Sequence, residues 1–381
     1  MKKILGIIVV FTLGLFMVAC DSTTESGVKV GLISSAATFK DKGYNEFALD
    51  GLNQAKADFD ITANHVEGRD SSAIAETLDR FGREKYALVF SLEYDFDVLI
   101  KSYKGGKSIA ERYPDTTFVV FNATPNTDNE GNKIHDNVIE VLFNVNEGSF
   151  LAGALYTLVN ENRDALFTDT KYKFADARVA AFMGATESEG ISVFAYGFYQ
   201  GINYVAAQKD VVYDIYETYQ AGFAASTENA NRAKAFYEND ANVIFGVAGP
   251  VAGNIRNEAE TAGRLMIDVD ANQDAQKPGF ILTSVLKNTN TVVYDMIKEL
   301  IEDKLETGTV RYFSLVTEST GITDLEEIVK HINQSQLTLW NTIKAEIETI
   351  KGKIVSGDIV VIDAQKGDTL NKSSLTNLNF K

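Results

Sequence analysis

The sequence predicts an α/β protein of two lobes, each built on a doubly wound parallel sheet with helices on both faces. Short runs rich in Val, Ile and Phe alternate with helix-length patterns along the chain, which indicates parallel sheets with helical crossovers. Several of these runs lack polar–apolar alternation, as is typical of strands buried on both faces. The runs number more than ten, too many for one comfortable sheet of this kind, so we expect two sheets.

The expected strands fall into two groups along the chain. The first group is Lys29–Ser34, Ile61–Glu67, Ala87–Leu92, Thr117–Asn122 and Val138–Phe143. The second group is Val179–Gly184, Val211–Thr218, Val243–Ala248, Arg264–Asp270, Ile281–Leu286 and Val310–Val316. The helical patterns between them are Tyr44–Phe59, Ser72–Phe81, Val98–Tyr113, Gly148–Val159, Ser192–Gln208, Ala225–Tyr237 and Asn290–Leu305.

We expect the chain to pass between the lobes more than once. The N-terminal lobe takes residues 29–143 plus 271–308, and the C-terminal lobe takes 144–270 plus 309–362. The second lobe ends in two helices, Leu325–His331 and Leu337–Ile354, and a last strand at Ile359–Ile362. The remaining residues, 363–381, are polar, and we expect them to form a frayed tail.

The N-terminus has the marks of a secretory signal at residues 1–19. Lys2 and Lys3 precede an apolar run from Ile4 to Ala19, which is too short to span a membrane and remain there. Cys20 follows directly and resembles the acylated Cys of a bacterial lipobox, with Met17 where Leu is usual. That resemblance implies a lipid anchor on Cys20, a short tether over 20–28 and an extracytoplasmic location at the cell membrane. An uncleaved anchor with an incidental Cys is the alternative.

Composition excludes several classes of function. The formal charge is −17, which argues against a nucleic-acid-binding surface because such surfaces need basic patches. Cys20 is the only Cys, so neither disulfides nor a thiol catalyst are expected. The three His residues are scattered, and no catalytic, zinc or calcium motif is present. We therefore expect no catalytic residue, no metal and no cofactor, although the abundant carboxylates leave an exported nucleosidase open.

Seven segments, spread in order over residues 29–361, resemble the basic membrane protein family, which includes the purine nucleoside receptor lipoproteins of spirochaetes. The resemblance lies in the whole set rather than in any single motif. The segments are Asp41–Asn45, Glu147–Gly153, Phe194–Gly201, Val243–Gly249, Asp268–Gln273, Leu282–Lys287 and Lys353–Ile359.

This resemblance implies a type I periplasmic-binding-protein fold, serving an ABC importer as a monomeric solute-binding lipoprotein. Its expected partners are a permease, an ATPase and a small-molecule nucleoside, without nucleic acid. The ligand would lie between the lobes at the carboxyl ends of the strands, as in other open α/β sheets. A surface receptor or signalling lipoprotein for another ring compound is the alternative function.

The resemblance also implies which side chains hold the ligand. Tyr44 and Phe194 stand at the family positions whose aromatic rings stack on the base from the two lobes. Asp270 and Lys287 stand where the family has groups that bind the ribose, one accepting and the other donating hydrogen bonds. A buried core position for Phe194 and a helix cap for Asp270 are the structural alternatives.

Three further positions complete the expected site. Asn45 either contacts polar ligand atoms or caps the helix that begins near it, and Gly249 allows the backbone to approach the ligand. Asn122 follows a strand where the family often has an Asp that reads the base edge. Because an amide both donates and accepts hydrogen bonds, this replacement favours adenosine or inosine over guanosine.

Overall fold

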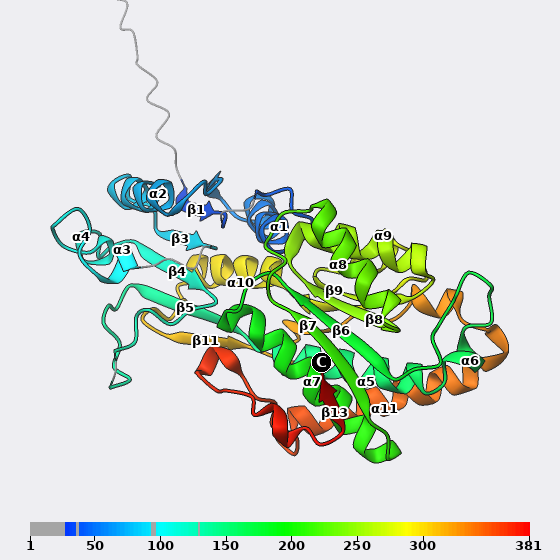
Figure 1. Cartoon of the computed structure of the whole chain (residues 1–381). Coiled ribbons are helices and arrows are strands. Elements are labelled where there is room, and N and C mark those ends of the chain that lie inside the picture. The colour runs from blue at the N-terminus through cyan, green and yellow to red at the C-terminus, as the bar shows by residue number, and fades with distance from the viewer. Residues whose placement is uncertain (1–26, 36–37, 93–96, 129) are drawn as a thin grey trace, which may run out of the picture.

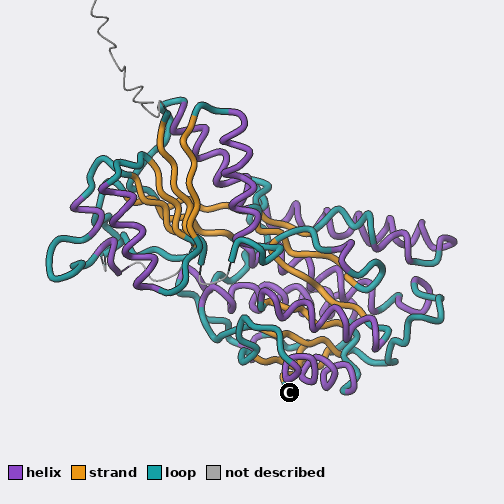
Figure 2. The backbone as a smooth tube through the Cα atoms, turned by 90° about the horizontal axis from the view of Figure 1, so that it is seen from above, coloured by secondary structure: helices purple, strands orange, loops and turns teal. Residues whose placement is uncertain are grey.

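Two sheets with helices on both faces form two lobes, as predicted (Figures 1 and 2). The structure is a computed structural model that describes residues 27–35, 38–92, 97–128 and 130–381. The expected signal segment and Cys20 lie outside the described residues.

The first sheet is entirely parallel, with strand order β11-β5-β4-β3-β1-β2. Adjacent residues of one strand belong to separate apolar clusters: Phe121 packs on the α1 side and Val120 on the α2 side. This period of two explains why these strands read as continuous apolar runs. The strands are β1 (Val28–Ile33), β2 (Ile61–Val66), β3 (Leu88–Ser91), β4 (Thr117–Phe121), β5 (Val138–Phe143) and β11 (Val310–Phe313). The helices are α1 (Tyr44–Asp58), α2 (Ser71–Arg83), α3 (Asp97–Ile100), α4 (Ile109–Arg112) and α10 (Thr289–Ile301).

The second sheet has the order β12-β10-β9-β8-β6-β7-β13 and is parallel except for β12. Its strands are β6 (Val179–Gly184), β7 (Tyr213–Thr218), β8 (Val243–Val247), β9 (Leu265–Asp270), β10 (Ile281–Lys287), β12 (Thr320–Ile322) and β13 (Leu378–Phe380). Its helices are α5 (Val145–Asn160), α6 (Arg163–Leu166), α7 (Glu189–Lys209), α8 (Thr227–Glu238), α9 (Ala252–Ala262) and α11 (Leu337–Val355).

Two strands lie in the opposite sheet from the one expected. β10 pairs with β9 in the second sheet, and β11 pairs with β5 in the first. The crossing therefore comes after β10 rather than before it, and α10 returns to pack on α1. The three crossovers lie side by side: the Asn144 N–H donates to the Phe313 carbonyl (2.8 Å) and the Asn288 N–H to the Ser319 carbonyl (3.0 Å). These crossovers connect the two lobes, and we call them the hinge.

Other differences have local causes. The single helix expected over Val98–Tyr113 is instead two short helices, because Lys104 and Gly105 take positive φ angles of 49° and 71°. The expected helix Leu325–His331 shrinks to a 3₁₀ turn at Ile328–His331. Residues 359–362 form no strand; the Val360 side chain there is 82% exposed.

The C-terminal residues 363–381 are ordered on the second lobe, so the prediction of a frayed tail is wrong. Leu370, Leu375 and Leu378 are buried, and β13 extends the second sheet beside β7. The ring of Phe380 lies edge-on to that of Tyr199, with centroids 5.1 Å apart. The few apolar residues in this polar stretch bury enough surface to fix it.

Candidate functional site

A cavity of about 590 Å³ lies between the lobes, at the carboxyl ends of the strands. Its walls come from the loop before α1 and α1 itself in the first lobe, and from α7 and the ends of β8, β9 and β10 in the second. Six of the seven predicted ligand-binding residues line it: Tyr44, Asn45, Phe194, Gly249, Asp270 and Lys287.

Asp270 ends β9 with a φ of 70°, a left-handed conformation that Asp tolerates better than most residues. Burial raises the pKa of its carboxyl to about 6, an effect that the nearby Lys287 ammonium opposes. Among the residues that the structure describes, none donates a hydrogen bond to this carboxylate. Its acceptor oxygens are therefore available to a ligand in the cavity.

Lys287 ends β10 and is only 5% exposed. Burial lowers the pKa of its ammonium to about 8, although the Asp270 charge acts in the other direction. Nζ donates to Oδ1 of Asn122 (2.5 Å) and lies 4.9 Å from the ring centroid of Tyr44. This ammonium has no carboxylate partner within ion-pair distance in the described part of the chain, so an amide and aromatic faces hold it in place.

The predicted aromatic residues present their rings from opposite lobes. Tyr44 begins α1, and its ring is edge-on to that of Phe121, with centroids 6.5 Å apart. Phe194, in α7, is 3% exposed and lies edge-on to Phe245, with centroids 6.2 Å apart. Phe194 therefore belongs both to the core and to the cavity wall, which combines the two alternatives considered for it.

Sequence reasoning missed a third aromatic residue, Phe223. It lines the same cavity and is 51% exposed, which is unusual for so large an apolar side chain. It follows β7 in a loop whose Gly222 has a φ of 63°. The sequence did contain a signal for Phe223: it is an aromatic residue next to a Gly, in the loop that follows a predicted strand.

The side chain of Asn45 is used in hydrogen bonds within the protein. Its Oδ1 accepts the Ser35 N–H (2.8 Å), and its Nδ2 donates to Ser35 Oγ (3.0 Å) and to Asp41 Oδ2 (2.7 Å). The Asp41 carboxylate also accepts the backbone N–H groups of Gly43, Asn45 and Glu46. Asp41 thus caps the start of α1, and Asn45 ties the loop to β1.

Asn122 does not line the cavity, unlike the other predicted residues. Its Nδ2 donates to the Tyr44 hydroxyl (2.8 Å), and its Oδ1 accepts from Lys287 Nζ. Both polar atoms of the amide are engaged by side chains that do line the cavity. Asn122 therefore lies one layer behind the surface that a ligand would contact.

Gly249 follows β8 with a φ of 52°, which Gly adopts without strain. A Cβ built there would meet only the Phe223 ring, at 3.8 Å. Gly is thus favoured at position 249 because of the left-handed backbone conformation at the cavity wall, not because space is short.

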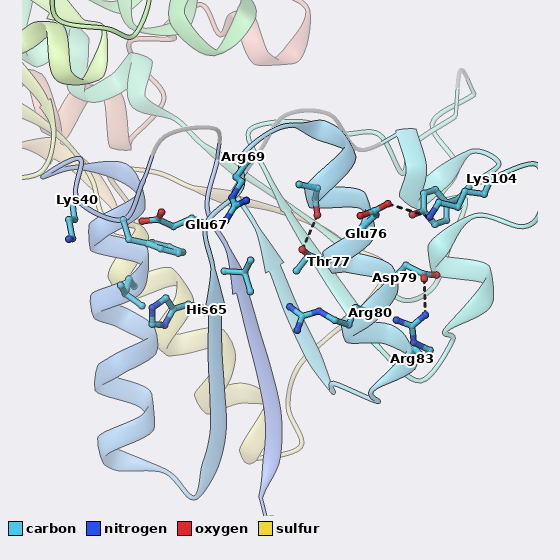
Figure 3. A pocket seen from close by; sticks show the side chains of 15 residues that line it. Lys40, His65, Glu67, Arg69, Glu76, Thr77, Asp79, Arg80, Arg83 and Lys104 are labelled. Carbon is cyan, nitrogen blue, oxygen red and sulfur yellow. Dashed lines mark hydrogen bonds and ion pairs between the residues drawn. The ribbon is translucent and has the colours of Figure 1, made fainter.

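A larger and more open cavity of about 890 Å³ lies on the first lobe, where α2 meets the end of β2 (Figure 3). Charged side chains line it, and two ion pairs form among them: Arg83 with Asp79 (3.4 Å), both on α2, and Lys104 with Glu76 (3.6 Å). It contains none of the predicted site residues. Its mixed charges suit a solvated surface, whereas the interlobe cavity offers the aromatic walls and few convergent polar groups typical of small-molecule sites.

Two parallel-sheet lobes, three crossovers and an interlobe cavity are the architecture of proteins that bind a small solute between two lobes. Residues 28–354 match the family model of the PnrA-like ABC transporter substrate-binding proteins, and the chain belongs to this family. It is thus a solute-binding component of an ABC transporter and not an enzyme. The predicted family is confirmed.

The following relatives align with 80% or more of this chain. Basic membrane protein C of Borreliella burgdorferi is 24% identical over 96% of this chain and 98% of that protein. The CD4+ T-cell-stimulating antigen of Listeria monocytogenes is 21% identical over 94% and 97%. An uncharacterized lipoprotein of Pyrococcus abyssi is 22% identical over 80% and 71%.

Solved structures agree on the fold. A solute-binding protein of an ABC transporter system from Aeropyrum pernix superposes with a TM-score of 0.73 at 20% identity, covering 92% of this chain and 95% of that one. A periplasmic binding protein/LacI regulator from Alkaliphilus metalliredigens, complexed with D-xylulofuranose, gives a TM-score of 0.52 at 15% identity, with coverages of 79% and 99%. The predicted type I periplasmic-binding-protein fold is confirmed.

Neither a membrane span nor a metal centre occurs in the part of the chain that the structure describes. No helix there combines the length and apolar character needed to cross a bilayer. The same residues contain no group of three or more His, Cys, Asp or Glu side chains that could hold a metal ion.

Proposed function

We propose that this solute-binding protein captures a purine nucleoside between its lobes and delivers it to a permease driven by an ATPase. The main support is the free carboxylate of Asp270, directed to a cavity that Tyr44, Phe194 and Phe223 also line. Aromatic faces suit a flat base, and a carboxylate can accept hydrogen bonds from both vicinal hydroxyls of a ribose. Lys287 donates beside it, so the site matches an uncharged ligand with a ring at one end and hydroxyls at the other.

We further propose that the base is adenine or hypoxanthine rather than guanine. A carboxylate in place of the Asn122 amide would form an ion pair with the Lys287 ammonium behind the cavity wall, whereas the neutral amide only accepts a hydrogen bond from it. With Asn122 in this position, the carboxylate whose charge acts on the Lys287 ammonium is that of Asp270 in the cavity wall. The charged ammonium of Lys287 can then donate hydrogen bonds to the ligand, which favours ligands with acceptor atoms such as purine ring nitrogens.

Calorimetric titration of ligand-stripped residues 21–381 tests both proposals. The panel is adenosine, inosine, guanosine, cytidine, uridine and ribose. We expect saturable one-to-one binding of adenosine or inosine, weaker binding of guanosine and little binding of free ribose, because ribose lacks the ring that stacks. A folded sample that binds none of the nucleosides would eliminate the nucleoside proposal. A guanosine affinity far above that of adenosine would eliminate only the role given to Asn122.

We also propose that Cys20 is acylated and holds the protein at the extracytoplasmic face of the cell membrane. Support comes from the signal-like residues 1–19 and from the absence of any other Cys in the sequence. Detergent phase partitioning of the protein expressed with its signal checks this. We expect the wild type in the detergent phase and Cys20→Ser in the aqueous phase, whereas equal partitioning of the two would contradict acylation.

A further inference from the structure

We propose that residues 359–381, which we call the C-terminal strap, restrain the hinge and position two ligand-binding side chains from behind. The strap follows α11 and lies entirely beyond the part of the chain that matches the family model, which ends at residue 354. In Figure 1 it forms the loop that leaves α11, reaches toward β11 and returns to the second lobe as β13. The restraint does not depend on which ligand the cavity binds.

The strap is anchored to the second lobe at both ends. Near its start, Asn146 Nδ2 donates to the carbonyls of Val361 (3.0 Å) and Ile362 (3.3 Å). Near its end, β13 pairs with β7, and the Asn377 side chain donates to the Val211 carbonyl (2.8 Å). These anchors fix the part between them as a loop of defined position rather than a free tail.

Between the anchors, the strap touches the first lobe at two places. Gln365 Nε2 lies 3.5 Å from the carbonyl oxygen of Asn122, and Lys366 Nζ lies 4.8 Å from the ring centroid of Tyr312 in β11. Gln365 Oε1 is buried without a hydrogen-bond partner. Burying an amide oxygen without a hydrogen-bond partner is unfavourable. We therefore infer that packing, rather than its own hydrogen bonds, holds the Gln365 side chain at the lobe boundary.

Asn122 connects this contact to the ligand cavity. It sits at the end of β4 with a φ of 64°, and its side chain holds both the Tyr44 hydroxyl and the Lys287 ammonium. The strap supports the backbone carbonyl of this residue while its amide supports two residues of the cavity wall. Gln365 and Lys366 are therefore positioning residues that act through Asn122 and β11.

The carboxylate of Asp363 caps a turn in the middle of the strap and lies near the hinge. The Asp363 carboxylate accepts the Gln365 N–H (3.0 Å) and is 3% exposed. Burial raises the pKa of Asp363, and the charge of Glu147 acts in the same direction. Glu147 itself accepts the Leu315 N–H (2.9 Å) and the Asn144 side chain (3.1 Å), both of which belong to hinge crossovers. Asp363 of the strap is thus close to a carboxylate that joins two of the crossovers, the segments that must change conformation when the lobes move.

A distance measurement between the lobes tests the restraint without any ligand. Residues 21–381 contain no Cys, so Glu84→Cys on the first lobe and Glu238→Cys on the second provide two spin-label sites, both exposed. Pulsed electron–electron double resonance is recorded on the ligand-free, spin-labelled protein and on the same protein carrying Gln365→Ala plus Lys366→Ala. The matched control is Lys381→Ala, which removes a strap residue whose ion pair with Asp214 (3.1 Å) lies within the second lobe.

We expect the double variant to shift or broaden the interlobe distance distribution, and the control to reproduce the wild-type distribution. Adenosine affinity should fall about 3- to 10-fold in the double variant alone, because a smaller fraction of molecules is preorganised. Coinciding distributions for all three folded proteins, as judged by circular dichroism, would overturn the proposal. Failure of adenosine to bind would instead count against the nucleoside ligand and leave the distance result decisive.

Discussion

Replacement of Asp270 with Asn is expected to weaken adenosine binding about 10- to 100-fold at pH 7.5. The substitution keeps the shape of the side chain and its left-handed backbone, but it removes the charge and half of the acceptor capacity. Hydrogen bonds to a charged group contribute about 1.5–3 kcal/mol each. Titration calorimetry of the two proteins with adenosine measures the difference.

The same substitution is expected to leave stability unchanged or to increase it. Because burial raises the pKa of the Asp270 carboxyl from 3.8 to about 6, the folded state binds its proton more tightly than the unfolded state. The stabilisation from this proton is complete below pH 3.8 and is lost as the pH rises through 6. At pH 7.5 the ionised carboxylate therefore opposes folding, and the neutral amide removes that cost.

Asp210→Asn is the matched control, because Asp210 is another Asp in the left-handed conformation, with a φ of 53°, at the end of α7 and outside the cavity. We expect it to bind adenosine like the wild type. Wild-type affinity should also fall as the pH drops through about 6, whereas that of Asp270→Asn should stay flat. Equal affinities of Asp270→Asn and wild type at pH 7.5 would rule out the carboxylate as a ligand contact.

Replacement of Gly201 with Ala is expected to destabilise the protein by about 1–3 kcal/mol, as overpacking a well-packed core does. In the second lobe, α5 and α7 cross so closely that a Cβ on Gly201 would overlap the backbone carbonyl of Phe150. Gly153 faces the Phe198 backbone in the same way. Because backbone atoms are in the way, no rotamer change relieves the overlap, and the midpoint of urea unfolding should fall.

Gly253→Ala is the opposite case and provides the comparison. Gly253 lies in α9, and no atom lies within 4 Å of the Cβ it would gain. Ala favours a helix over Gly by about 0.5–1 kcal/mol, so this midpoint should rise. If both variants moved in the same direction, close helix packing at Gly201 would be the wrong explanation.

Most of the sheet structure was predictable because buried parallel strands depend on local sequence. Runs such as Val138–Phe143 and Val179–Gly184 coincide with β5 and β6, since they are apolar on both faces. What a strand pairs with depends on the path of the chain through the hinge. β10 and β11 were therefore found as strands and assigned to the wrong sheets.

Elements that depend on distant partners were the ones missed. β13 has only three residues and exists because β7 offers it an edge. Similarly, the sequence identified Asn122 as a site residue but could not indicate that Lys287 and Tyr44 occupy both ends of its amide. Phe223 carries no family motif, and its role depends on where the loop after β7 lies.

The central claim, a nucleoside held between the lobes, is tested most directly by titrating adenosine into the wild type and Phe194→Ala in parallel. Phe194 lines the cavity from the second lobe and is the stacking face that the account requires there. The account predicts one-to-one binding to the wild type and a loss of about 1–3 kcal/mol in the variant, the usual contribution of stacking on one base. Equal binding to two folded proteins would contradict it, because the nucleoside would then lie outside the interlobe cavity.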